Sequence, residues 1–220
     1  GAFGHIVQPK LVYISNPTEL GTLYNRSELE ALSETCRKLG LYLFLDGARL
    51  GYGLVAEGYD VTMEDIARLC DVFYIGGTKC GTLFGEALVV ANRALLKNHF
   101  PLVKQHGALL AKGRLLGVQF GALFRDGLYE RIGEGAVQLA LRIREAFRAA
   151  GYEVVKESPT NQQFFRLPND VIDRLRETIS FDYWGPRGAT DSVVRFVTSW
   201  ATSEEAVEAL IAVLNKETVE

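Results

Sequence analysis

LYLFLDGARLG, residues 41–51, is the most informative segment for the fold of this chain, together with DVFYIGGTKCG, residues 71–81. Each segment is a short apolar run that ends in glycine and charged residues, which is typical of a buried strand entering a loop. The first run delivers Asp46 and Arg49, and the second delivers Lys79, 33 positions after Asp46. That spacing fits a strand, a helical crossover and a parallel neighbouring strand. Because parallel strands end at one edge of a sheet, we expect these side chains to lie together where α/β sheets bind ligands.

The flanking sequence continues the alternation of strand and helix. LVYIS (residues 11–15) predicts a strand that Asn-Pro terminates, and Ser27 with Glu30 predicts a capping box at the start of a helix ending near Gly40. Thr62 with Asp65 repeats the cap before a second helix, and GEALVV (residues 85–90) predicts one more strand. The strands are apolar throughout, as expected of a parallel sheet covered on both faces. The sequence therefore predicts an α/β fold.

The pattern changes after Asn92. Helix is expected over residues 93–124 and again over 128–150, where Gly151 closes it. Strands are then expected over residues 152–158, 162–167 and 192–200, with a helix around 170–178 and a last helix capped by Ser203. This later region is therefore predicted to form an α+β unit.

Composition narrows the classes of partner. The 220 residues are 48% hydrophobic and 23% charged with a formal net charge of −3, and no long run of one sign suggests nucleic-acid or membrane-surface binding. No apolar run reaches the roughly 18 residues of a membrane span. The three cysteines have no C-x-x-C spacing and the three histidines have no metal-site spacing, so we expect no metal and a reducing, cytoplasmic location. A small-molecule partner is expected.

An acidic side chain and a lysine at one sheet edge are what a pyridoxal 5'-phosphate site needs. The lysine amine can bind the aldehyde of the cofactor, and a carboxylate near the pyridine nitrogen keeps that nitrogen protonated. Asp46 could instead cap the turn before Gly47. The apolar strand and the following Lys79 favour the cofactor role.

The sequence resembles the β-eliminating lyase and threonine aldolase group of pyridoxal-phosphate enzymes, which have the aspartate-aminotransferase-like fold. The resemblance rests on ISNPTELGTLY (residues 14–24), FLDGARLGYG (44–53), IGGTKCGTLFGEALVV (75–90) and VVRFVTSWAT (193–202). It implies a fold type I, pyridoxal-phosphate-dependent transferase-like architecture: a three-layer sheet and a smaller C-terminal α+β domain. Residues 1–92 would form the later part of the large cofactor-binding domain, and residues 93–220 the connecting helices and the small domain. A homo-oligomer, dimer or tetramer, is also implied.

The resemblance implies roles for the charged residues at the strand ends. Lys79 would carry the cofactor and Asp46 would face its pyridine nitrogen. Arg49 and Arg195 would bind the substrate carboxylate, since a guanidinium can hold a carboxylate bidentately. A surface salt bridge is the alternative for Arg195.

Three residues are candidates for contacting the phosphate group of the cofactor. Thr78 lies beside the cofactor lysine, and AKGR offers Lys112, with Arg114 as the alternative. We take Lys112 as the expected phosphate contact. The family has a long segment before the point where this sequence starts, and that segment supplies the phosphate-binding turn and the histidine that stacks on the ring. The chain as given is therefore expected to bind the cofactor poorly.

The resemblance implies a lyase that splits a threonine-like β-hydroxy-α-amino acid into glycine and an aldehyde. A β-eliminating amino-acid lyase on the same fold is one alternative, because both reactions use the same cofactor chemistry. A non-catalytic remnant of such an enzyme is another.

Overall fold

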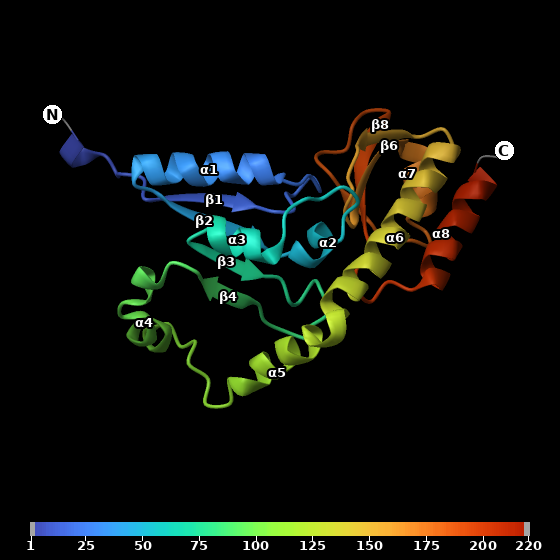
Figure 1. The fold of residues 1–220 in the computed structure, drawn as a ribbon. Coiled ribbons are helices and arrows are strands. Elements are labelled where there is room, and N and C mark those ends of the chain that lie inside the picture. The colour runs from blue at the N-terminus through green and yellow to red at the C-terminus, as the bar shows by residue number, and fades with distance from the viewer. Residues whose placement is uncertain (1–2, 218–220) are drawn as a thin grey trace.

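Two four-stranded sheets joined by a long helix make up the computed structural model, which describes residues 3–217 (Figure 1). The first sheet has the order β1-β2-β3-β4, from β1 (Leu11–Ser15), β2 (Tyr42–Gly47), β3 (Val72–Ile75) and β4 (Ala87–Val90). The first three strands are parallel, as predicted, and β4 pairs antiparallel with β3. The carboxyl ends of β2 and β3 therefore lie side by side, so the segments carrying Asp46 and Lys79 leave the same edge.

Helices α1 (Arg26–Leu39) and α3 (Met63–Leu69) pack on one face of this sheet. Alternate strand residues such as Leu43, Leu45 and Phe73 are buried there against the apolar sides of both helices. Tyr13, Tyr42 and other residues of the opposite face are exposed. The expectation that both faces are covered is thus not met within residues 3–217, because β2 alternates between buried and accessible positions.

The start of α1 differs from the prediction. Asn25 is the N-cap: its side chain accepts from the Glu28 amide at 2.9 Å, and the Glu28 carboxylate accepts from the Asn25 amide at 2.9 Å. Ser27 already lies inside the helix and donates to Asn25 Oδ1 at 2.6 Å. The capping box predicted for Ser27 is therefore wrong, since Asn25 satisfies the same rule one half-turn earlier. The box of Thr62 and Asp65 is confirmed.

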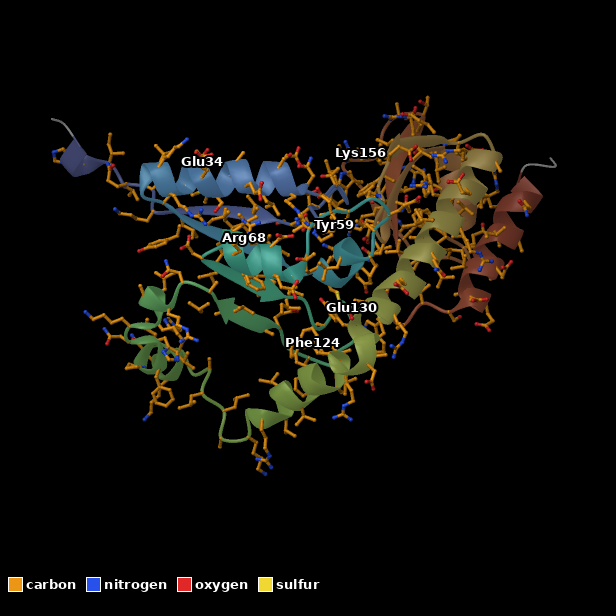
Figure 2. The ribbon with its side chains drawn as sticks, viewed as in Figure 1. Glu34, Tyr59, Arg68, Phe124, Glu130 and Lys156 are labelled. Carbon is orange, nitrogen blue, oxygen red and sulfur yellow. The ribbon has the colours of Figure 1, made fainter. Side chains whose placement is uncertain are left out.

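The single helical stretch predicted over residues 93–124 is broken. It consists of the 3₁₀ turn η2 (Arg93–Leu96), α4 (His99–Gln105) and α5 (Arg114–Leu123). Asn98 (φ 63°) and Gly107 (φ 69°) have left-handed backbone conformations, which end a right-handed helix. Figure 2 shows Phe124 where α5 passes through η3 (Arg125–Gly127) into α6 (Leu128–Ala149). Gly151 (φ 83°) ends α6 as predicted. Two further short helices are η1 (Phe3–His5) and α2 (Leu50–Leu54).

The second sheet has the order β5-β6-β8-β7 and is antiparallel throughout. Its strands are β5 (Glu153–Lys156), β6 (Gln162–Pro168), β7 (Asp182–Tyr183) and β8 (Asp191–Val197), and α7 (Asn169–Leu175) and α8 (Glu204–Glu217) pack with it. The Ser203 hydroxyl accepts from the Ala206 amide at 3.2 Å, which supports the predicted cap of α8. The two-residue strand β7 was not predicted, because it lies in a loop-like segment rich in glycine and aromatics.

Helix α6 contributes to both hydrophobic cores. Tyr129 and Val137 pack in the core of the first sheet, and Ile143 and Phe147 pack in that of the second. One continuous helix thus sets the distance between the two sheets, and the proposed division of the chain at residue 92 stays a prediction. Within residues 3–217, no helix is both long and apolar enough to cross a membrane.

Candidate functional site

The turns that follow β2 and β3 pack against each other backbone to backbone. The Gly76 amide donates to Gly47 O at 2.8 Å. A Cβ atom added to Gly76 would lie 2.2 Å from Ala48 O, so only glycine permits this approach. The DGAR and GGTK segments are thereby brought together.

Two buried tyrosines hold the backbone of the turn that follows β3. Tyr52, on α2, donates its hydroxyl to Lys79 O, and Tyr129, on α6, donates to Gly76 O at 2.9 Å. Both side chains are fully buried, and burial raises the pKa of each phenol, so both stay protonated and remain donors. The backbone of Lys79 is therefore held in place although its side chain is exposed.

A pocket of about 200 Å³ opens beside Lys79, between the strand ends of the first sheet and the second sheet. The part of the chain before α6 supplies two hydroxyls and two cations to this pocket, and the part after α6 supplies an amide, two hydroxyls, an apolar side chain and an aromatic ring. The lining consists of Arg49, Tyr52, Thr78, Lys79, Asn161, Val197, Thr198, Ser199 and Trp200. Trp200 donates its indole N–H to Thr78 O at 3.3 Å, which joins the two walls. The structure thus brings Lys79, Arg49 and Thr78 together as predicted.

Asp46 is the penultimate residue of β2 and lies outside the lining of this pocket, and both its carboxylate oxygens accept hydrogen bonds. Oδ1 accepts from the Ala48 amide at 2.9 Å and Oδ2 accepts from the Tyr13 hydroxyl. Burial acts to raise the pKa of Asp46, but hydrogen bonds from Tyr13, Tyr74 and Ala48 and the charge of Lys79 outweigh it and lower the pKa. Asp46 is therefore an ionised carboxylate near a lysine ammonium. The contact to the Ala48 amide is the turn role that was the alternative for Asp46, and the cofactor role stays a prediction.

The two arginines are placed differently. Arg49 lines the pocket, with Nη1 3.5 Å from Glu19 Oε1. Arg195 binds Asp182 with Nη2 at 2.7 Å from Oδ2, and its guanidinium lies over the Trp184 ring at 4.9 Å. Arg195 does not line the pocket, and its Nη1 also donates to Gln162 Oε1 at 3.1 Å. Its role toward the substrate carboxylate stays a prediction.

Lys112 and Arg114 lie at the start of α5 and do not line the pocket. Asn161, which lies just before β6, also lines the pocket, although no sequence motif singled it out. Its side chain is buried, Nδ2 donates to Thr198 O at 2.6 Å, and Oδ1 has no hydrogen-bond partner among residues 3–217. Polarity alone does not identify such a residue, because its burial depends on the second sheet.

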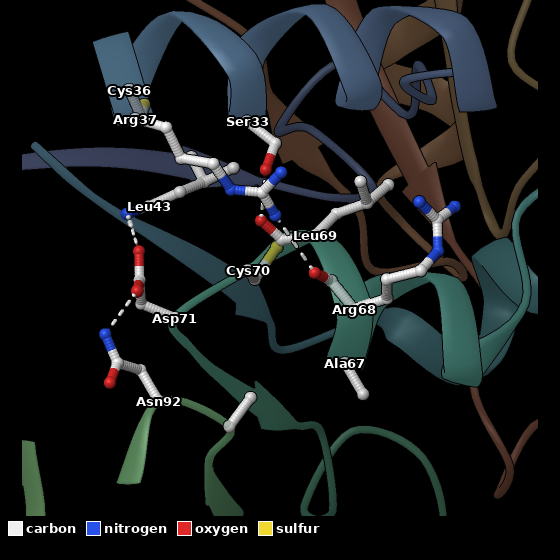
Figure 3. A pocket seen from close by; sticks show the side chains of 11 residues that line it. Ser33, Cys36, Arg37, Leu43, Ala67, Arg68, Leu69, Cys70, Asp71 and Asn92 are labelled. Atoms are coloured by element: carbon white, nitrogen blue, oxygen red, sulfur yellow. Dashed lines mark hydrogen bonds between the residues drawn. The ribbon is translucent and has the colours of Figure 1, made fainter. Parts of the chain in front are cut away.

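A second cavity, of about 170 Å³, lies at the opposite edge of the first sheet, between α1 and α3 (Figure 3). Its polar groups are already paired: Ser33 donates to Leu69 O at 2.7 Å, and Asp71 accepts from Asn92 at 2.7 Å and from the Leu43 amide at 2.8 Å. Burial raises the pKa of the Cys70 thiol in its wall to about 12. This cavity therefore presents no activated nucleophile.

Comparison with known proteins gives consistent matches. The family described as beta-eliminating lyase matches residues 1–170. A low specificity L-threonine aldolase of Pseudomonas aeruginosa is 32% identical over 209 residues, covering 94% of this chain and 59% of that protein. The corresponding protein of Escherichia coli K12 is 29% identical, with coverages of 94% and 60%. The chain therefore spans about three fifths of the length of these relatives.

Solved structures agree with this result. A threonine aldolase of Leishmania major superposes with a TM-score of 0.94 at 44% identity, covering 98% of this chain and 63% of that one. An aspartate aminotransferase of Thermus thermophilus superposes with a TM-score of 0.67 at 17% identity, covering 94% and 56%. The second match shows the shared fold, which is the predicted aminotransferase-like one.

Proposed function

This chain belongs to the beta-eliminating lyase family, and from that premise we propose that it acts as a pyridoxal-phosphate-dependent carbon–carbon lyase. The substrate would be a threonine-like β-hydroxy-α-amino acid, and the products glycine and an aldehyde. The relatives named above as threonine aldolases favour this reaction over β-elimination. The structural observation that carries the proposal is the pocket in which Lys79 and Arg49 meet next to the end of β2.

The residues of the site fit pyridoxal phosphate by their chemistry. Lys79 offers an amine for the aldehyde, Asp46 an ionised carboxylate for the pyridine nitrogen, and Thr78 a hydroxyl for the phosphate. When bound, the cofactor supplies an electron sink for the bond that breaks at the substrate's α-carbon. Asn161 adds a buried acceptor that has no partner in the described part of the chain, and a donor group in the filled pocket would satisfy it.

Arg49 would bind the substrate carboxylate and thereby orient the amino acid. Arg195 would assist only after exchanging its bond to Asp182 for one to the substrate, which would draw the second sheet toward the pocket. Lys112 stays a prediction as a phosphate contact. We further propose a homo-oligomer in the cytoplasm, which fits three free, buried cysteines.

Incubation with L-threonine and saturating pyridoxal phosphate tests the proposal. Acetaldehyde with glycine is the expected product pair, whereas 2-oxobutyrate with ammonia would indicate β-elimination. Lys79→Ala is the negative control and is expected to give neither product pair. Lys104→Ala, on the exposed helix α4, is the matched lysine control and is expected to keep the activity of the unaltered protein. Neither product pair from the unaltered protein would favour the non-catalytic alternative.

A further inference from the structure

Side chains from three neighbouring strands meet at Asp46. The Tyr13 hydroxyl, from β1, donates to Asp46 Oδ2, and Tyr74, on β3, is the register partner of Asp46 on the other side. The Tyr13 ring stacks on Phe44 with centroids 5.2 Å apart and planes 12° apart, which directs its hydroxyl along the sheet. We call Asp46, Tyr13 and Tyr74 the Asp46 cluster.

An ionised carboxylate has about four acceptor positions. The Ala48 amide and the Tyr13 hydroxyl take two of them, and Tyr74 lies beside Asp46 as its register partner on β3 and helps to lower the pKa of the carboxyl. We propose that Tyr13 and Tyr74 are positioning residues, which orient the Asp46 carboxylate and leave acceptor capacity free for a ring N–H. The identification of this ring as pyridoxal phosphate rests on the proposed function. The proposed orientation of Asp46 by the two tyrosines does not depend on that function.

The cluster also sets the charge of Asp46. Burial works against ionisation, and the groups that oppose it are the two phenols, the Ala48 amide and the Lys79 ammonium. Because the pKa of Asp46 is lower in the folded than in the unfolded chain, its contribution to stability is present above the unfolded pKa. That contribution is lost as the pH falls through the folded pKa. Removing the Tyr13 hydroxyl raises the folded pKa toward the unfolded one, so the contribution becomes smaller and its loss is complete at a higher pH.

Sequence position does not reveal this arrangement. Tyr13 pairs in register with Phe44 and not with Asp46, so its hydroxyl reaches the carboxylate diagonally across the strand. Diagonal neighbours on parallel strands lie within reach of a long aromatic side chain. The contact thus depends on the stacked orientation of the Tyr13 ring.

The test compares Tyr13→Phe and Tyr74→Phe with Tyr42→Phe. Tyr42 lies on the same accessible face of β2 and outside the Asp46 cluster, so its variant controls for the loss of a surface phenol. Phenylalanine keeps each ring, so the fold is expected to survive, and circular dichroism checks it. Carbon-13 NMR titration of the aspartate carboxyls without cofactor measures the pKa, with the Asp46 signal assigned through Asp46→Asn.

We expect the Asp46 pKa to rise in Tyr13→Phe and in Tyr74→Phe and to stay at its original value in Tyr42→Phe. An unchanged Asp46 pKa in both cluster variants would overturn the proposal. So would an equal rise in the Tyr42→Phe control.

The second measurement adds pyridoxal phosphate and records its absorption as a function of pH. As the pH is lowered, the absorption of the bound cofactor is expected to disappear at a higher pH in Tyr13→Phe than in the unaltered protein. In Tyr42→Phe it is expected to disappear at the same pH as in the unaltered protein. A rise of the Asp46 pKa with no cofactor spectrum in any variant, including the unaltered protein, at saturating pyridoxal phosphate would contradict the proposed function and not the positioning of Asp46. A cofactor spectrum whose pH dependence is the same in Tyr13→Phe and the unaltered protein would overturn the role of the cluster toward the ring.

Discussion

Lys79 combines a fixed backbone with an exposed side chain. Tyr52 holds its carbonyl group, and the amine projects beside a pocket that also contains Arg49. Lysine is a flexible, compact cation, so a fixed backbone limits the volume its amine can search. At the scale of the single residue, this is the feature that makes Lys79 the candidate for cofactor attachment.

Reduction of the protein with borohydride in the presence of pyridoxal phosphate, followed by peptide mapping, is expected to label Lys79. Lys79→Ala is expected to keep the circular dichroism spectrum and lose the label, because the exposed side chain makes no packing contribution to the core. Labelling at Lys104 or Lys112 in place of Lys79 would show that the cofactor lysine is misassigned.

Among the secondary-structure elements, the stability of helix α1 depends on its N-cap residue, Asn25. Asn25→Ala removes the acceptor for the Glu28 amide and is expected to reduce the free energy of unfolding by about 0.5–2 kcal/mol. Ser27→Ala is the control, since Ser27 lies inside the helix, and its effect is expected to be smaller. Urea unfolding of both variants measures the difference. A larger loss for Ser27→Ala would restore the cap that the sequence suggested.

The turns that follow β2 and β3 pack against each other and are expected to depend on glycine at position 76. Gly76→Ala places a methyl group against Ala48 O, and relief of that contact must separate the turns. We expect a loss of about 1–3 kcal/mol in unfolding free energy and a weaker cofactor spectrum. Gly121→Ala, at an open position inside α5, is the matched control and is expected to stabilise the protein by about 0.5–1 kcal/mol. Retention of the cofactor spectrum in Gly76→Ala would show that the close approach is dispensable for the site.

At the scale of the whole molecule, the first sheet leaves one face accessible. Leu11, Tyr13, Tyr42 and Leu88 on that face are each at least 41% exposed, and large contiguous apolar patches are uncommon on monomers. We therefore expect self-association, measured as a concentration-dependent sedimentation coefficient. Leu88→Glu, which charges the centre of the exposed region of β4, is expected to shift the equilibrium toward monomer. A monomer across the micromolar range for the unaltered protein would contradict this expectation.

Local signals in the sequence were sufficient for every described strand except β7, for most helices and for the family. The apolar runs ending in DGAR and GGTK predicted β2, β3 and their parallel pairing, because strand propensity and turn residues act over a few neighbouring positions. Resemblance in the same segments predicted the aminotransferase-like fold, which the structural matches confirm.

Only the tertiary structure decided which side chains meet. Asn161 enters the pocket and Arg195 pairs with Asp182 because α6 places the second sheet beside the first and because β7 pairs with β8. Tyr13 reaches Asp46 through the stacking of its ring on Phe44. These contacts join segments far apart in the chain, and their free energy depends on distance, burial and orientation, which no short stretch of residues encodes.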